Sequence, residues 1–136
     1  MHRALRAVGG GVVGTFVLGF FLLVLDTQAR GALSVAGVIA RFLGISGRPV
    51  LAIALFAVLT AVGWPLLFVA VEEYLPLGPD PAARAVVFAG VIGVVFVAVG
   101  RGTIAGPILV IYVGFSLLAH LAYGFVLGSV YGRLAG

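Results

Sequence analysis

The chain has 136 residues, of which 63% are hydrophobic and 9% are charged, and its formal net charge is +4. Because so few charged side chains cannot cover a soluble domain of this length, the composition excludes a soluble globular protein and predicts a multi-pass protein embedded in the lipid bilayer. The basic residues are all arginines that stand singly at the ends of apolar segments. Such positions suit lipid headgroups, so we do not expect nucleic-acid binding.

An apolar stretch at residues 8–25 predicts the first membrane span. It follows Arg3 and Arg6, as in a signal peptide, but it is longer than the apolar region of a typical signal peptide, and no small-x-small cleavage motif follows it. We therefore expect a retained transmembrane helix, with Asp26 as a residue at its boundary.

The connection after the first span, at residues 32–45, is apolar but is interrupted by Arg41. Its apolar residues contribute roughly −2 to −4 kcal/mol to insertion and a central arginine costs about 2.5 to 3.5 kcal/mol, so the segment is not expected to span. At helical spacing its apolar residues fall on one side, with Arg41 and Arg48 on the other. This pattern predicts an interfacial amphipathic helix along the membrane surface. A helix folded over the bundle end and buried by a partner is the alternative.

Three further apolar stretches predict membrane spans, at residues 50–71, 82–100 and 108–132. Pro65 lacks the N–H that would bond to the carbonyl of Ala61, so we expect a bend in the second span. The connection at residues 72–84 is rich in proline and acid, which predicts a loop in water with Glu72 and Glu73 at its solvated edge.

The expected fold is therefore an all-α bundle of four transmembrane helices, with one interfacial helix between the first two spans, in a single membrane domain. Four crossings place both termini on one side of the membrane. The arginines divide equally between the two sides, so the positive-inside rule leaves the orientation open.

Small residues recur every four positions on three of the predicted spans. Such grooves let helix backbones approach closely, and the resulting van der Waals contact holds helices together in lipid. We interpret these residues as helix-packing positions within one chain, with self-association or docking to another subunit as the alternative. They are Gly11, Thr15 and Gly19 in the first span, Ala85, Ala89 and Gly93 in the third, and Gly124, Gly128 and Gly132 in the fourth.

Polar residues follow one face of the fourth span. Tyr112, Ser116, His120 and Tyr123 are separated by steps of four, four and three, so they form a polar stripe that faces the bundle. His120 lies near mid-membrane, where an ionisable group is a functional candidate. We favour a structural interpretation, in which a neutral imidazole bonds to Ser116, a tyrosine or a neighbouring helix and fixes how the helices dock.

A chemical role for His120 would need partners that the sequence does not place nearby. A bis-histidine haem would take its second ligand from His2, near a membrane surface, and a proton path would need a carboxylate, but the acidic residues lie at segment ends or in a loop. With no cysteine and no hydrolase or phosphate-binding motif, we expect no catalytic residues, no metal site and no cofactor, and a protein that is not an enzyme.

Several short motifs together resemble a family of small, functionally uncharacterised four-span membrane proteins of halophilic archaea. These motifs are GGGVVGTFV near the start, LD after the first span, ARFLG in the interfacial segment, WPLLFVA in the second span and HLAYGFVLGSVYG near the end. The resemblance implies a loose association with respiratory oxidase components. It assigns no chemistry to the family-like positions His120, Tyr123, Gly124 and Gly128.

From these observations we expect a non-catalytic accessory or structural subunit of a larger complex in the cell membrane, with a terminal-oxidase-associated respiratory complex as the leading candidate. Its partners would be the bilayer and other membrane subunits, or further copies of itself. The alternative is a small homo-oligomeric transporter or channel for an ion or small solute. In that case Tyr112, Ser116 and His120 would line a path near the bend at Pro65.

Overall fold

The computed structural model describes residues 1–29 and 31–135, and every regular element in this part of the chain is helical. Four of these helical segments are long and apolar enough to cross a membrane, which confirms the prediction of an all-α protein with four such helices. The elements are α1 (Arg3–Gln28), α2 (Val35–Phe42), α3 (Pro49–Val58), the π-helical turn η1 (Leu59–Gly63), α4 (Trp64–Val71), the 3₁₀ turn η2 (Glu72–Tyr74), α5 (Pro81–Gly100) and α6 (Pro107–Arg133).

The helices begin where the local chemistry supplies a first turn. A proline stands near the start of α3, α5 and α6, where its missing N–H has no helical partner to lose. The Asp80 side chain caps α5 by accepting a hydrogen bond from the Ala82 N–H at 3.1 Å. The helices therefore extend a few residues beyond the apolar stretches, because hydropathy marks the membrane-compatible part of a helix and not its ends.

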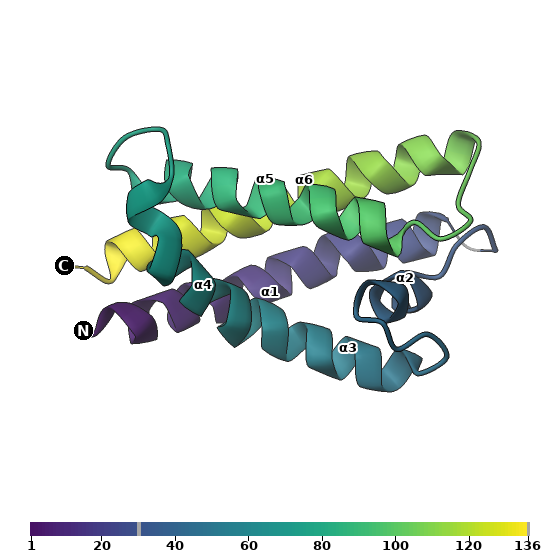
Figure 1. Ribbon diagram of the computed structural model, residues 1–136, viewed down its shortest axis with the longest axis horizontal. Helices are drawn as coiled ribbons and strands as arrows, with labels where there is room; N and C mark the ends of the chain where they lie inside the picture. The colour runs from purple at the N-terminus through teal and green to yellow at the C-terminus, as the bar shows by residue number, and fades with distance from the viewer. Residues whose placement is uncertain (30, 136) are drawn as a thin grey trace.

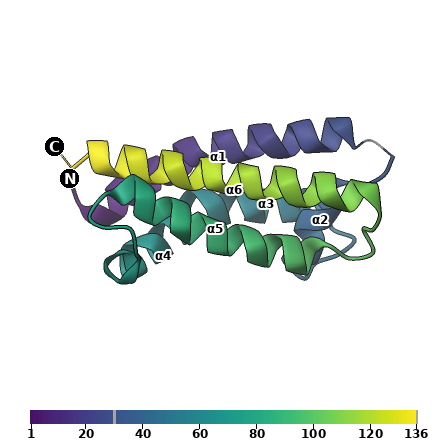
Figure 2. The same ribbon diagram turned by 90° about the horizontal axis from the view of Figure 1, so that it is seen from above.

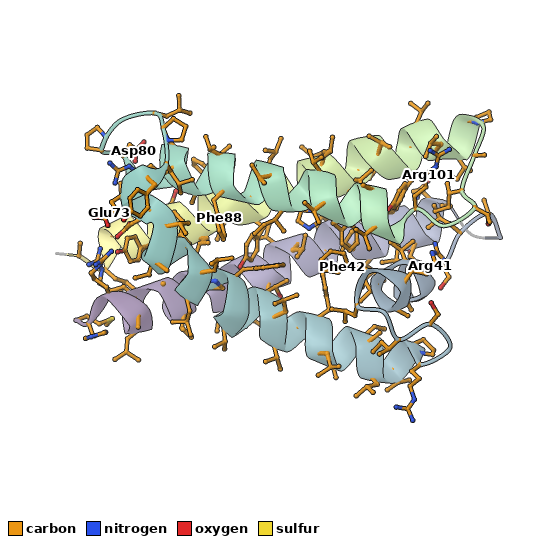
Figure 3. The ribbon with its side chains drawn as sticks, viewed as in Figure 1. Arg41, Phe42, Glu73, Asp80, Phe88 and Arg101 are labelled. Atoms are coloured by element: carbon orange, nitrogen blue, oxygen red, sulfur yellow. The ribbon has the colours of Figure 1, made fainter. Side chains whose placement is uncertain are left out.

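Helix α6 forms the middle of the bundle, with α1 on one side and α5 on the other (Figure 2). The second span, made of α3, η1 and α4, crosses α1 at η1 and α4. Both termini lie at one end of the bundle, and α2 lies at the opposite end (Figure 1). Figure 3 places Arg41 and Arg101 at the α2 end and Glu73 and Asp80 at the other.

The second span changes direction at η1, where α4 turns away from the line of α3 (Figure 1). The Trp64 N–H donates to the carbonyl of Leu59, five residues back. Pro65, the next residue, has no N–H to donate. The bend thus occurs as a π-helical turn immediately before the proline, a recognised cause of sharp changes in helix direction.

Helix α2 is shorter than the stretch at 32–45 because its flanks cannot continue it. Gly31 and Gly44 both have positive φ, at 84° and 74°, and the Ser34 side chain caps the first turn by accepting from the Gly37 N–H. The apolar side of α2 packs on α3 and α5 of the same chain, with Val38 and Ile39 buried. The position of this helix at a membrane surface stays a prediction.

Candidate functional site

The polar stripe on α6 lies inside the bundle. Tyr112, Ser116, His120 and Tyr123 are each at most 2% exposed. Their spacing turns them toward the neighbouring helices and away from the outer surface. Each of these side chains is therefore buried by other parts of the same chain, without the need for a second copy.

His120 is held by its own helix and by α5. Its Nδ1 lies 2.7 Å from the carbonyl oxygen of Ser116, and because a carbonyl can only accept, Nδ1 is the protonated nitrogen. The ring packs on Phe96 with centroids 4.9 Å apart, and its Cβ would lie 2.9 Å from a Cβ added at Gly93. The imidazole Nε2 is buried, and no partner lies within hydrogen-bonding distance among the described residues.

Two further buried polar atoms have no hydrogen-bond partner in the described part of the chain. They are the hydroxyl oxygen of Ser116 and the indole Nε1 of Trp64. Buried polar atoms without partners are rare because each loses its bonds to water without replacement. Ser116 and His120 therefore give the centre of α6 unused hydrogen-bonding capacity.

Tyr123 joins α6 to the π-helical turn. Its hydroxyl donates to the carbonyl of Thr60, and the Thr60 hydroxyl lies 2.8 Å from the hydroxyl of Thr15 on α1. Thr15 also donates to the carbonyl of Gly11 at 2.7 Å. This chain of contacts connects α1, the second span and α6 near the middle of the bundle.

Tyr112 and Arg41 both bind the carboxyl end of α5. The Tyr112 hydroxyl donates to the carbonyl of Val97 at 3.0 Å, and the Arg41 Nε donates to the carbonyl of Gly100 at 3.0 Å. The last carbonyls of a helix have no partners within it and carry its negative dipole end, so a guanidinium there is favourable. Arg48 instead lies exposed at the start of α3, without a side-chain cap bond.

Most of the predicted small-residue positions make close contacts within the chain. A Cβ added at Gly124 would lie 2.5 Å from both the Ala85 carbonyl oxygen and the Ala89 Cβ, and one at Gly128 would lie 2.4 Å from the Pro81 carbonyl oxygen. These distances are shorter than any real Cβ contact, so α5 and α6 touch backbone to backbone. Gly132 is less crowded, with its nearest neighbour at 3.4 Å.

The first span packs through the predicted Gly11 and also through two glycines that were not predicted. Gly11 abuts the second span, since an added Cβ would lie 2.5 Å from the carbonyl oxygen of Ala61. Against α6 the contacts are made by Gly10 and Gly14, which meet Leu127 and Tyr123. A Cβ added at Gly19 would have no neighbour within 4 Å among the described residues. The four-residue spacing of Gly10 and Gly14 was visible in the sequence, but the run of three glycines at 9–11 offered several registers.

A polar cluster that sequence reasoning missed lies at the end holding the termini. Arg3 forms an ion pair with Glu72, whose side chain is 13% exposed, and the Tyr131 hydroxyl donates to the same carboxylate at 2.8 Å. The Arg6 guanidinium lies 4.1 Å from the centroid of the Tyr131 ring. The interpretation of Glu72 as a solvated loop residue is therefore wrong, whereas Glu73 is exposed. Tyr131 continues the stripe spacing eight residues beyond Tyr123, which was the available signal.

A cavity of about 370 Å³ lies between α1, α2 and α3. It begins at Thr15 and Thr60, where the second span meets α1, and ends at Asp26 and Ser34 beside α2. Its walls between these polar ends are apolar apart from Gly19, and the residues that form them are Leu18, Gly19, Leu22, Leu23, Val35, Ala36, Ile39, Ile53, Phe56 and Ala57. No residue of the polar stripe lines it. Among residues 1–29 and 31–135, no three His, Asp or Glu side chains gather as metal ligands would.

The fold and these sites define a class of protein: a helical bundle with four helices long and apolar enough to cross a membrane, in which several buried polar side chains join neighbouring helices. The chain belongs to the family of unknown function DUF6789, whose family model matches residues 1–136. No curated protein and no solved structure matches it.

Proposed function

We propose that the chain is a non-catalytic accessory or structural subunit of a larger membrane complex. The observation that supports this best is the use made of polar groups within the spans, since Tyr112 and Tyr123 donate to carbonyls of neighbouring helices. Polar side chains used in this way stabilise the bundle and leave its outer surface apolar.

Most of the small-residue faces already pack within the chain. We therefore expect a partner to dock on exposed apolar side chains that follow one another along the outer face of a helix. The strongest such row lies on α1, where Phe16 and Phe20 stand one turn apart and are 77% and 63% exposed. Aromatic side chains contribute large contact areas at interfaces. We therefore place the partner contact on this face of α1.

The proposed setting is the plasma membrane of a halophilic archaeon, with a terminal oxidase or another respiratory complex as the first assembly to examine. Helix α2 is proposed to lie at one membrane surface, where Arg41 and Arg48 can reach headgroups. Its place at the end of the bundle opposite the termini is compatible with that location (Figure 1).

The test is gentle extraction of the tagged protein from native membranes, followed by mass determination and identification of what co-migrates. We expect a complex containing respiratory subunits, and we expect Phe16→Ala combined with Phe20→Ala to release the chain from it. The matched control is Leu121→Ala combined with Phe125→Ala on α6, whose side chains are also exposed. A discrete small mass with no partner would contradict the proposal.

A second candidate, a small transporter or channel, rests on one observation: the Nε2 of His120 and the hydroxyl of Ser116 are buried and have no hydrogen-bond partner among residues 1–29 and 31–135. A path along these atoms would run inside each bundle, because the stripe cannot face a second copy of the chain. Flux through proteoliposomes that falls several-fold in His120→Ala would favour this candidate. Equal flux in empty liposomes and in liposomes containing the protein would remove it.

A further inference from the structure

The cavity between α1 and α3 has a length and a volume that restrict what can occupy it. It follows α1 from Thr15 to Asp26, eleven residues that span roughly 16 Å at the rise of an α-helix. Thr15 lies at the middle of α1 and Asp26 near its end. One half of the hydrocarbon core of a bilayer is about 15 Å thick. The cavity therefore reaches from mid-membrane to one surface.

The mean cross-section of the cavity can be compared with the cross-sections of a partner helix and of a hydrocarbon chain. Dividing about 370 Å³ by that length gives a mean cross-section of roughly 23 Å². A helix is about 10–12 Å across and needs roughly 80–110 Å². An extended hydrocarbon chain, whose carbons contact their neighbours at about 3.5–4.0 Å, needs only roughly 20 Å².

The two ends of the cavity differ in the way that a lipid requires. At the deep end the two hydroxyl protons of Thr15 and Thr60 have acceptors within the bundle, namely the carbonyls of Gly11 and Ala57 and the partner hydroxyl, so they require no polar group from a ligand. At the mouth the Ser34 hydroxyl accepts from the Gly37 N–H and can still donate its own proton. Such a donor suits the ester or ether oxygen that joins a lipid chain to its glycerol.

Contacts near both ends of the cavity hold α1 and α3 apart along its length. Helix α1 meets the second span at η1, and α2 packs between α1 and α3 at the other end. Gly19 lies between these points and faces the open space, since an added Cβ would meet nothing within 4 Å. A larger side chain there would fill the cavity without disturbing the contacts that hold the bundle together.

We propose that this cavity binds one hydrocarbon chain of a membrane phospholipid, with the chain terminus at Thr15 and Thr60 and the glycerol region at Ser34. The proposal does not depend on the subunit role, because the cavity is formed entirely within one chain. A bound chain would complete the apolar surface between α1 and α3 in one leaflet.

The experiment uses the purified full chain, washed free of native lipid and reconstituted in nanodiscs of palmitoyl-oleoyl phosphatidylcholine. After extraction into mild detergent, native mass spectrometry counts the phospholipids that remain on each chain. We expect one retained phospholipid in the wild type and at least a tenfold lower retained fraction in Gly19→Leu. The matched control is Gly114→Leu, because Gly114 is also open but lies on α6 outside the cavity.

A second pair of variants guards against misfolding of Gly19→Leu. Ala57→Phe fills the opposite wall and is expected to lose the phospholipid, whereas Ala54→Phe, exposed on the same helix but outside the cavity, is expected to keep it. The proposal is overturned if the wild type retains no phospholipid, or if both members of a pair retain it equally. Because the purified chain is measured without any partner, this result tests the lipid site alone, and the subunit role is tested separately by extraction from native membranes.

Discussion

The hydroxyl of Tyr123 in α6 donates a hydrogen bond to the main-chain carbonyl of Thr60 in η1. In a regular helix that carbonyl would accept from the N–H of Trp64, but the Trp64 N–H bonds to Leu59, and Pro65 has none to offer. The tyrosine therefore supplies the donor that the bend has removed. Both residues are about 1% exposed, so water cannot take its place.

Tyr123→Phe should lower the free energy of unfolding by about 1–3 kcal/mol, because it leaves the Thr60 carbonyl buried without a donor. Thermal unfolding of the purified protein in mild detergent measures the effect. Tyr74→Phe is the matched control, since Tyr74 is 79% exposed. Equal stability of Tyr123→Phe and the wild type would mean that another donor reaches this carbonyl.

Replacing the proline should reduce the requirement for the tyrosine. Pro65→Ala restores an N–H to the second span, which can then bond to the carbonyls of η1. In a double-mutant cycle, Tyr123→Phe should cost less in the Pro65→Ala background than in the wild type, with a coupling of about 0.5–3 kcal/mol. Additive effects of the two substitutions would contradict this account of the bend.

Gly124→Ala should destabilise the bundle by about 1–3 kcal/mol, because the added methyl would lie 2.5 Å from α5 and force the two helices apart. Gly114→Ala has open space around the new methyl, and it should be neutral or stabilising by up to about 1 kcal/mol through helix propensity. Detergent unfolding curves of the two variants, compared with that of the wild type, separate packing from propensity. Loss of stability in both would indicate a general intolerance of alanine in α6.

Arg41→Ala should weaken the carboxyl end of α5 by about 0.5–1.5 kcal/mol, since it removes a donor to the Gly100 carbonyl and a cation at the negative end of a helix dipole. Faster amide hydrogen exchange at residues 101–104 would report local loosening. Arg48→Ala removes a charge of the same sign without such a bond and should leave this exchange unchanged. If amide exchange became equally faster in both variants, the cause would be the loss of positive charge and not the loss of the bond to Gly100.

Glu72→Gln should lower the midpoint of thermal unfolding, because it removes the ion pair with Arg3 and weakens the acceptor for Tyr131. The difference from the wild type should shrink in high salt, which screens exposed charges. Glu73→Gln, at an exposed site, should have little effect at any salt concentration. A salt-independent loss in Glu72→Gln would point to the hydrogen bond with Tyr131 as the dominant contribution.

The sequence predicted the four long apolar helices because lipid leaves only apolar side chains on most of each helix surface. It also identified Pro65, whose missing N–H is a local property. The contacts of the polar groups were harder to obtain. Glu72 and Arg3 are far apart in the chain, and only the antiparallel arrangement of the spans brings them to one end of the bundle.

Helix faces were predicted less well where small residues were abundant. In α1 the glycines at 9–11 and 14 allow more than one packing register against α6. The structure adopts the register in which Gly10 meets Leu127 and Gly14 meets Tyr123. The cavity had no sequence signal, because it depends on the angle at which α3 leaves the π-helical turn. Properties of a single residue, such as the missing N–H of Pro65, could thus be predicted from the sequence. The packing register of α1 and the cavity could not, because they depend on how two helices are oriented relative to each other.

The central position of α6 has a consequence for biogenesis. The helix that contacts both α1 and α5 is synthesised after both of them, so the small-residue faces at Gly10, Gly14, Ala85 and Ala89 stay uncovered until α6 arrives. A chain arrested before residue 107 would hold three inserted segments and no finished interior. Quality-control proteases of the membrane should therefore degrade such truncated chains rapidly, and the insertion of α6 becomes the step that completes the bundle.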